Sequence, residues 1–448
     1  MAGVFGLSES WLTQNGDLVP DALVLSHHEQ LARLRRYYPP AAGVAVIAGD
    51  PCLDRLAASG HLRETYRAAL GIEPGRRLVV VSSTWGRRSL FGRSPDLLER
   101  IAAELPLDEY AVAVALHPNI WHWHSPAQIK GWLSDCALAG VRLVPPLEAW
   151  RAAVIAADVV VGDHGSVTFY AAVVGRPVLI AAADPEGVDP ESPIARFSAA
   201  APRLQRGIPL RAQLDAVIRD PQRERYAEIL TEATSAPGRS AELVRGLLYR
   251  MLDLSEPARP ARTSIVPVPR DLAPLPVTAM VTSTSVRVSG NGATVNVDRY
   301  PAVLRLADPP AGDNHLLVEW HHPDPSLLDD ADVLLADVRT ASQQPREWTQ
   351  QALARFPGCA LAAAAEPDGS CLIGTRDGRA FTVRAEETTE SSPAVLVSAV
   401  LALLTAERSL DGGLPDRITI VSGPVTRVAS LTELPADPAP LPTPPAEY

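Results

Sequence analysis

Short apolar runs alternate with longer amphipathic segments through the first half of the chain. The runs that have the character of buried strands are Leu78–Ser82, Ala111–Leu116, Val141–Val144, Asp158–Val161 and Val178–Ala182. The segments between them have the length and periodicity of helices. Continuous apolar strands separated by helices are typical of a parallel sheet covered on both faces. The pattern therefore predicts an α/β domain with a Rossmann-like parallel sheet.

The pattern changes twice after this region. Helical segments continue to residue 254, and residues 255–275 hold five prolines with little periodicity, which is typical of a linker. From residue 276, apolar and polar positions alternate about a Gly-Asn-Gly turn, which predicts a β-hairpin. A helix, a second hairpin and a strongly apolar helix over Pro393–Glu407 follow. This second region predicts a separate α+β domain.

These changes divide the chain into five expected segments. They are a connector, or the remnant of a further N-terminal domain, at 1–42, the α/β domain at 43–254, the linker at 255–275, the α+β domain at 276–434 and a Pro-rich, disordered tail at 435–448. We found no internal repeat.

Charge narrows the classes of function. The net charge of −11 argues against a nucleic-acid partner. Of the 41 Lys and Arg residues, Lys130 is the single lysine, which argues against a P-loop NTPase and a lysine Schiff base.

The spacing of the cysteines and the hydropathy of the chain indicate the cellular compartment of the protein. The four cysteines have the spacing of neither a zinc knuckle nor a C-x-x-C pair, so we expect reduced thiols. No run approaches the roughly 18 apolar residues of a membrane helix, and residues 1–12 do not have the features of a signal peptide. We predict a cytoplasmic protein, with peripheral contact to the inner membrane surface if its acceptor is membrane-associated.

Polar residues separate one predicted strand from the helix that follows it. Asp163, His164, Gly165 and Ser166 lie between them. Ligands of parallel sheets bind at the carboxyl ends of strands, facing helix N-termini. Gly165 permits close approach of a ligand, and Ser166 is placed to cap a helix whose first N–H groups attract phosphate. The stretch predicts a phosphate-binding turn; the alternative is a capped turn that binds nothing.

Two further strands end in polar residues. One is followed by Thr84, Arg87 and Arg88, and the other by His117. Arginine binds phosphate through two parallel hydrogen bonds, and histidine at a strand end can donate to phosphate or transfer a proton. We expect the three strand ends to converge on one crevice, although each alone has the alternative of solvated arginines or a loop histidine. A metal site at His122 and His124 is not predicted, because no third ligand has suitable spacing.

Four stretches occur in an order that resembles a known superfamily. They are AGDPCLDRL at 48–56, VVVSSTWGRR at 79–88, ALHPNIW at 115–121 and VVVGDHGSVTFYAAVVGRPVLI at 159–180. Together they resemble the donor half of the GT-B glycosyltransferases, most nearly the CDP-glycerol glycerophosphotransferases of teichoic acid synthesis, with UDP-N-acetylglucosamine 2-epimerases as more distant relatives. Positions that fit the motifs are Gly49, Pro51, Asp54, Thr84, Trp85, His117, Pro118, Asp163, Ser166, Val167 and Phe169. Departures from them are Ser83, Gly86, Ala115, Gly165 and Tyr170.

The resemblance implies a transferase that binds a CDP- or UDP-linked donor and needs neither a cofactor nor a metal. It implies His117 as the catalytic residue. The residues expected to bind the donor and its phosphates are Thr84, Arg87, Arg88, Asp163, His164, Gly165, Ser166 and Val167. Another interpretation is an epimerase-like hydrolase, which would need a carboxylate in the crevice; Asp50, Asp54 and Asp163 are the candidates.

A GT-B enzyme has a second, acceptor-binding half in front of the donor half. Residues 1–42 are too few for such a domain, and His27-His28 does not fit its His-Gly motif. Three expectations remain open: a truncated start, a protein partner that supplies the missing half, or a non-catalytic scaffold.

Overall fold

A computed structural model describes residues 6–184, 187–289, 292–304, 310–337, 344–386, 392–407 and 413–435. The chain forms two compact units. Unit 1 runs to Leu105 and resumes over Tyr110–Leu275, and unit 2 combines Pro106–Glu109 with the chain from Pro276 onward. The tail expected at 435–448 lies outside the described residues except for Pro435.

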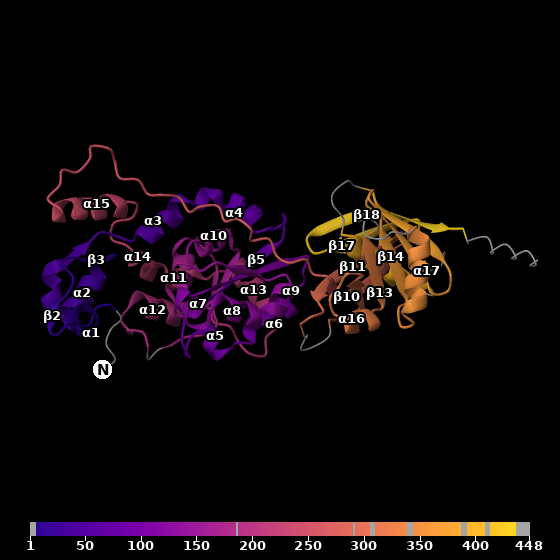
Figure 1. The fold of residues 1–448 in the computed structure, drawn as a ribbon, viewed down its shortest axis with the longest axis horizontal. Helices are drawn as coiled ribbons and strands as arrows, with labels where there is room; N and C mark the ends of the chain where they lie inside the picture. The colour runs from indigo at the N-terminus through magenta and orange to yellow at the C-terminus, as the bar shows by residue number, and fades with distance from the viewer. Residues whose placement is uncertain are drawn as a thin grey trace, which may run out of the picture. The chain divides into compact units, whose positions relative to one another are not determined.

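Unit 1 is built on a five-stranded parallel sheet (Figure 1). Its strands are β5 (Arg77–Ser83), β6 (Tyr110–Leu116), β7 (Arg142–Val144), β8 (Val159–Gly162) and β9 (Val178–Ile180). The strand order is β7-β6-β5-β8-β9, with every neighbouring pair parallel. This confirms the predicted Rossmann-like sheet, in which the order reverses between β5 and β8.

Helices cover both faces of this sheet. Those of the sheet region are α3 (Pro51–Ala58), α4 (Arg63–Ala69), α5 (Leu90–Arg93), α6 (Leu97–Glu104), α7 (Pro118–His124), α8 (Pro126–Trp132), α9 (Ser134–Leu138), α10 (Ala149–Ala156), α11 (Ser166–Val173), α12 (Pro193–Ala200), α13 (Leu210–Arg219) and α14 (Ala227–Thr231). Leu78 and Val80 of β5 join a core with residues of α4, α10 and α11. Because side chains alternate along a strand, Val79 and Val81 face the opposite layer, where α6 and α13 pack together.

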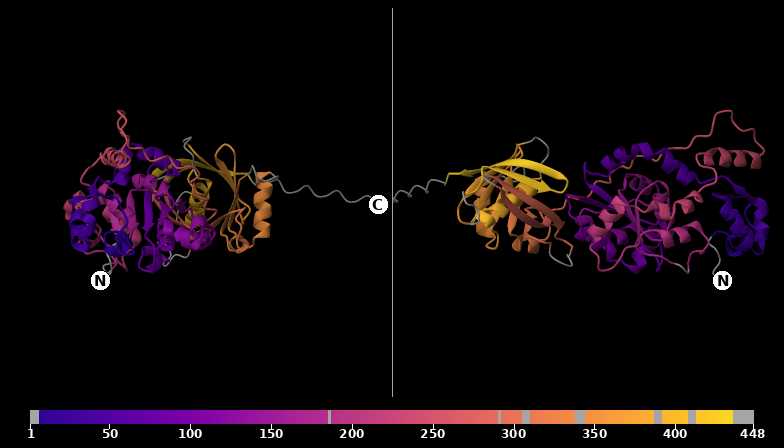
Figure 2. Two further views of the ribbon diagram at one scale, coloured as in Figure 1. Left: turned by 60° about the vertical axis from the view of Figure 1, so that its left-hand side comes forward. Right: turned by 180° about the vertical axis from the view of Figure 1, so that it is seen from behind.

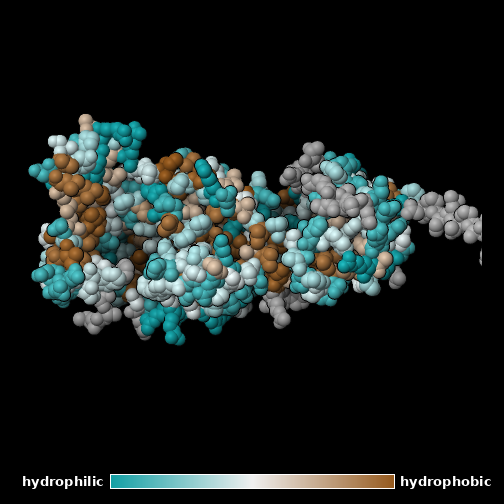
Figure 3. All heavy atoms as spheres, viewed as in Figure 1, coloured by the Kyte–Doolittle hydropathy of each residue, from teal (hydrophilic) through white to brown (hydrophobic). Residues whose placement is uncertain are grey.

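The N-terminal segment of unit 1 forms a small layer of its own. Its elements are α1 (Glu9–Leu12), β1 (Thr13–Gln14), β2 (Asp17–Leu18), β3 (Leu23–Leu25), α2 (His28–Tyr37) and β4 (Ala45–Ile47). β3 pairs in parallel with β4, and neither strand joins the five-stranded sheet. Near this segment lies α15 (Ser240–Met251; Figure 1). It exposes the apolar side chains of Leu248 and Met251, and Leu252 and Leu254 beyond the helix are exposed too; apolar surface is visible at this end of unit 1 in Figure 3.

Unit 2 is a closed barrel, seen from two further sides in Figure 2. Its strands are β10 (Ala279–Ser289), β11 (Gly292–Pro301), β12 (Asp313–Glu319), β13 (Val333–Asp337), β14 (Leu361–Ala365), β15 (Ser370–Thr375), β16 (Ala380–Ala385), β17 (Arg417–Ser422) and β18 (Val425–Leu434). The predicted hairpin is present, since β10 pairs antiparallel with β11. The predicted second α+β domain is confirmed, and closure leaves no edge strand in the barrel.

The apolar helix predicted at the end of this domain fills the barrel. α18 (Pro393–Ala406) packs against strands on every side, from β10 to β17. A helix that is apolar on all faces needs burial on all faces, and the barrel interior provides it. Outside the barrel lie α16 (Pro325–Asp329) and α17 (Pro345–Arg355); Trp348 of α17 packs onto the outer face of β14.

We expect the barrel to lose stability as the pH falls. His315 of β12 is buried against Ser398 of α18, 2.9 Å away, and burial lowers its pKa to about 4. Since the ordinary pKa is about 6.5, the unfolded chain binds an extra proton below that pH. The free energy of unfolding should therefore fall by about 2 kcal/mol between about pH 7.5 and pH 5.

Urea unfolding of the full chain at the two pH values measures this loss. His315→Gln should remove most of it, whereas His122→Gln, at an exposed position, should leave it intact. An equal pH dependence in all three proteins would contradict the assignment to His315.

Candidate functional site

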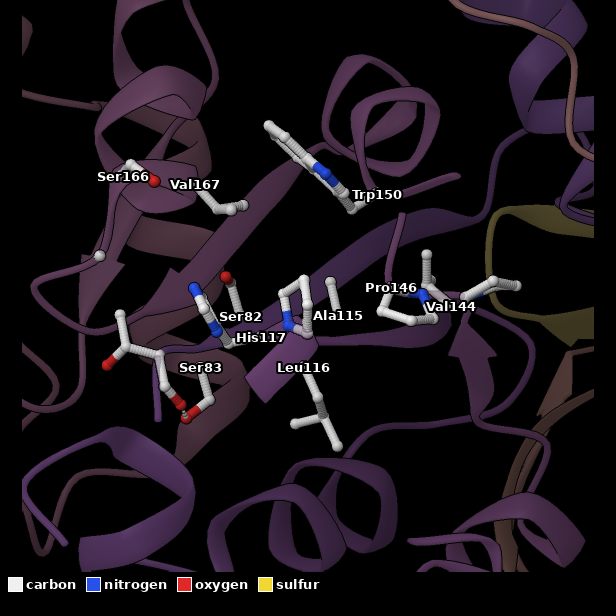
Figure 4. Close-up of a pocket in the computed structure, with 14 residues that line it drawn as sticks. Ser82, Ser83, Ala115, Leu116, His117, Val144, Pro146, Trp150, Ser166 and Val167 are labelled. Atoms are coloured by element: carbon white, nitrogen blue, oxygen red, sulfur yellow. Dashed lines mark hydrogen bonds between the residues drawn. The ribbon is translucent and has the colours of Figure 1, made fainter. Parts of the chain in front are cut away.

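A cavity lies at the carboxyl edge of the parallel sheet, where the strand order reverses. In open α/β sheets this switch point is the usual ligand site. The cavity measures ≈ 210 Å³. Its lining, shown in Figure 4, comprises Ser82, Ser83, Thr84, Ala115, Leu116, His117, Pro118, Val144, Pro145, Pro146, Trp150, Gly165, Ser166 and Val167. We call it the switch-point cavity.

The buried carboxylate of Asp163 holds the two loops of this cavity together. Its side chain accepts hydrogen bonds from the Thr84 amide (2.8 Å), the Thr84 hydroxyl (2.7 Å) and the Leu90 amide (2.9 Å) after β5. It also accepts from the Gly165 amide in its own loop (3.1 Å). Asp163 is fully buried, so it organises the turn and does not line the cavity.

The Asp163 bonds also decide what Thr84 can do. A threonine hydroxyl has one hydrogen to donate, and that of Thr84 goes to Asp163. Thr84 lines the cavity, but its hydroxyl serves to position the turn. It therefore cannot donate the same hydrogen to a phosphate, as was expected from the sequence.

The close packing of these two loops also requires a glycine at position 165. A Cβ at this position would lie 2.4 Å from the Thr84 side chain, well inside van der Waals contact. The serine that the GT-B motif has here could not be accommodated without moving Thr84. This explains one of the departures of the chain from the motif.

The N-terminus of α11 opens onto the cavity. The prediction that Ser166 caps this helix is wrong: Gly165 is the N-cap residue, no side chain caps the helix, and Ser166 is its first residue. The reason is that the residue before the helix is a glycine, which has no side chain to cap it. N–H groups in the first turn of a helix attract anions, and here the exposed Ser166 and the half-buried Val167 lie beside them.

His117 supplies a second hydrogen-bond donor to the cavity. It caps α7, with Nδ1 accepting from the Asn119 amide at 3.1 Å. In the neutral ring the proton then resides on Nε2. Burial lowers the pKa of His117, partly offset by the negative charge of Asp163. Near neutral pH, His117 is thus an uncharged ring with Nε2–H available to a ligand.

An apolar wall faces these polar groups. It consists of Val144 at the end of β7, Pro145 and Pro146 after it, and Trp150 of α10 (Figure 4). Trp150 stacks nearly parallel to Tyr170, with ring centroids 6.3 Å apart, and the Arg151 guanidinium lies 4.6 Å from its ring centroid. We missed Trp150 in the sequence because it lies inside a helix, away from any strand end.

The expected convergence therefore holds for some of the residues and fails for others. Thr84, His117, Gly165, Ser166 and Val167 line the switch-point cavity.

Arg87, Arg88 and His164 do not line it. Arg87 is exposed, and the exposed Arg88 pairs with Asp184 at 2.8 Å. His164 lines a different cavity on the other side of the turn. The reason is that the loop continues past Gly86 over Asp163, which carries both arginines away from the crevice.

The remaining carboxylates considered for a hydrolase are engaged in structural bonds. Asp50 caps α3 and accepts from the Tyr170 hydroxyl at 2.6 Å. Asp54 accepts from the Gly238 and Ser240 amides. Neither lines the switch-point cavity, which weakens the hydrolase interpretation. In the part of the chain that the structure describes, no three His, Cys, Asp or Glu side chains are grouped to hold a metal.

No protein-family model and no curated protein matches the chain. Similar solved structures include the wall teichoic acid polymerase TagF, 14% identical with a TM-score of 0.37, over 52% of this chain and 58% of that one. UDP-GlcNAc 2-epimerase from Neisseria meningitidis bound to UDP-GlcNAc is 16% identical with a TM-score of 0.32, over 51% and 61% of the two chains. WaaG, a glycosyltransferase involved in lipopolysaccharide biosynthesis, is 17% identical with a TM-score of 0.30, over 54% and 65%.

These structures include proteins of both enzyme groups that the sequence motifs resemble. The chain spans less than two thirds of the length of each of the three. At these TM-scores the likeness carries no argument about activity, which rests on the residues of this chain.

We expect Asp163→Asn to destabilise unit 1. In either orientation the amide NH2 would face a former donor, the Gly165 amide or those of Thr84 and Leu90, leaving buried groups unsatisfied. The free energy of unfolding should fall by about 3 kcal/mol, measured by urea denaturation of the full chain. Asp96→Asn, at an exposed position whose side chain caps nothing, is the matched control. Equal stability of the two variants would show that Asp163 does not hold the loops together.

Proposed function

We propose that unit 1 binds a nucleotide-diphospho donor, CDP- or UDP-linked, in the switch-point cavity and transfers its sugar or polyol phosphate to an acceptor. Such an enzyme would be a glycosyl- or glycerophosphotransferase serving the synthesis of a cell-surface polymer or glycan. The observation that carries the proposal is one cavity with an uncapped helix N-terminus, a neutral histidine donor and an apolar wall with a tryptophan.

The diphosphate belongs at the start of α11. Amides of the first turn attract its charge, and Ser166 adds a hydroxyl at the same place. Nε2–H of His117 is a further side-chain donor in the lining. With the two arginines outside the cavity, the site offers backbone amides, serine hydroxyls and one neutral imidazole as donors.

The apolar wall suits the nucleobase. A flat heterocycle stacks on aromatic and apolar surfaces, and Trp150 with Pro145 and Pro146 offers such a surface. The cavity volume of ≈ 210 Å³ is below the roughly 300 Å³ at which ligand pockets begin. The group to be transferred would therefore extend beyond Ser166, out of this cavity.

The reaction would be a direct displacement. With a CDP-polyol, the acceptor hydroxyl oxygen attacks the β-phosphorus, the bond from that phosphorus to the bridging oxygen breaks, and CMP leaves. With a UDP-sugar, the oxygen attacks the anomeric carbon and UDP leaves. In both cases the hydroxyl proton passes to a base. His117 and α11 would stabilise the charge on the departing phosphate.

A non-catalytic scaffold is the second candidate. Two observations favour it: the lining of the switch-point cavity contains no carboxylate to take the acceptor proton, and α15 exposes apolar residues that suit a protein partner. A partner that supplies an acceptor-binding half would reconcile the two candidates, because the base could come from that partner.

We propose that the protein is cytoplasmic and that, if its acceptor is lipid-linked, it works at the inner membrane surface. Its four cysteines are free, as expected in a reducing compartment. Among the described helices, none has the length and hydrophobicity needed to span a bilayer.

A thermal-shift titration with CMP, CDP, UDP, CDP-glycerol and UDP-sugars tests donor binding. A ligand at about 100 times its Kd stabilises the folded state by about 2.7 kcal/mol, which should raise the Tm of unit 1 by about 5 °C. Ser166→Glu should weaken binding at least about tenfold by repelling the diphosphate, while the carboxylate suits the helix N-terminus. Ser134→Glu, at the first position of α9, should bind as the wild type does.

His117→Asn separates the two roles of this residue in the same experiment. Asparagine can still cap α7, so the Tm without ligand should barely change. Loss of the Nε2–H donor should raise the Kd about tenfold. No shift with any nucleotide, or equal shifts in all variants, would contradict donor binding in this cavity.

A further inference from the structure

A second, larger cavity lies at the same edge of the sheet, beyond the end of β9. It measures ≈ 800 Å³. Its lining contains Arg93, Ser94, His164, Asp184, Arg196, Ser198, Arg203 and Arg206, with alanines, a valine and a proline completing the wall. We call it the arginine cavity. None of its lining residues belongs to the switch-point cavity.

The charge of this cavity is opposite to that of the chain. Among the residues that the structure describes, four arginines line it against one carboxylate, Asp184, which already pairs with Arg88. Arg196 pairs with Glu232 outside the lining. No carboxylate among the described residues forms an ion pair with Arg203 or Arg206. In a chain with a net charge of −11, this concentration of positive charge favours an anionic ligand.

Three buried polar atoms of the lining residues have no partner in the described structure. They are the hydroxyl of Ser198, whose residue is 5% exposed, Nδ1 of His164 and Nε of Arg196. A buried polar atom without a hydrogen bond costs about 1–3 kcal/mol, and such atoms are rare in native proteins. Their grouping around one cavity favours a polar ligand there.

Two of the four arginines are tethered to the backbone. Arg203 lies in a segment that extends the sheet, with the Ile180 amide donating to the Pro202 carbonyl (2.8 Å). Its guanidinium donates to the Ser198 carbonyl at 3.0 Å. Arg93 donates to the Ala183 carbonyl at 2.7 Å. One nitrogen of each guanidinium is thus tethered, and further N–H groups remain for a ligand.

We propose that the arginine cavity binds a second phosphate-bearing molecule, a polyol or sugar phosphate. Guanidinium groups match the geometry of phosphate oxygens, and the volume leaves room for an attached polyol or sugar. No Trp, Tyr or Phe is among the described lining residues, so these offer no aromatic stacking surface for a nucleobase. This separates its ligand chemically from the nucleotide of the switch-point cavity.

The two cavities flank one turn. His164 lines the arginine cavity, and the next residues, Gly165 and Ser166, line the switch-point cavity. A phosphate-bearing molecule in the arginine cavity would be the acceptor of the transferred group; this role rests on the proposed function, whereas binding itself does not.

Calorimetric titration of the full chain at low ionic strength with glycerol 3-phosphate, and with inorganic phosphate for comparison, tests the proposal. We expect glycerol 3-phosphate to bind more tightly than phosphate. Arg206→Gln should raise its Kd about fivefold or more, and Ser198→Ala should also weaken it. Arg219→Gln removes the same charge at an exposed site outside the cavity and should change the Kd less than about twofold.

The outcomes are distinguishable from those for the nucleotide site. Saturating CDP should leave glycerol 3-phosphate binding intact, and Arg206→Gln should leave the Kd for CDP unchanged. Binding of glycerol 3-phosphate without any nucleotide binding would support this site and remove the proposed function. No binding, equal weakening by Arg219→Gln, or displacement by CDP would overturn the arginine cavity as a separate site, as would equally tight binding of inorganic phosphate.

Discussion

One buried carboxylate determines the arrangement of the candidate site. Asp163 accepts hydrogen bonds from the loop after β5 and from its own loop after β8. A buried charge is tolerated only when such bonds compensate for its desolvation. These bonds bring Thr84 so close that residue 165 must be glycine. The glycine in turn leaves the N-terminus of α11 without a side-chain cap and open to an anion.

The turn that Asp163 stabilises also separates two chemical environments. On one side, a helix N-terminus, a neutral imidazole and an apolar wall with Trp150 suit a nucleoside diphosphate. On the other side, His164 faces a lining rich in arginine that suits a phosphate without a base. A transferase needs a donor and an acceptor near each other, and a single short turn between two such cavities meets that requirement within unit 1.

The sequence predicted the sheet because its strands are buried on both faces and appear as continuous apolar runs, as in β5 and β6. It did not predict the closed barrel. Alternation of apolar and polar residues in β10 and β11 indicates a sheet with one buried face, but it does not show which strands far apart in the sequence pair with each other. It placed Arg87 and Arg88 in the crevice since spacing alone cannot show that a loop turns outward. Trp150 was missed because a helical position gives no sign that it faces a ligand.

We propose above all that a nucleotide-diphospho donor binds at the start of α11. Backbone amide hydrogen exchange of the full chain, with and without saturating CDP or UDP, tests it most directly. The account predicts slower exchange in the peptide that covers Gly165 to Phe169 and in the loop after β6, with no change in barrel peptides such as β15. Nucleotide binding that leaves exchange at 165–169 unchanged would contradict the account.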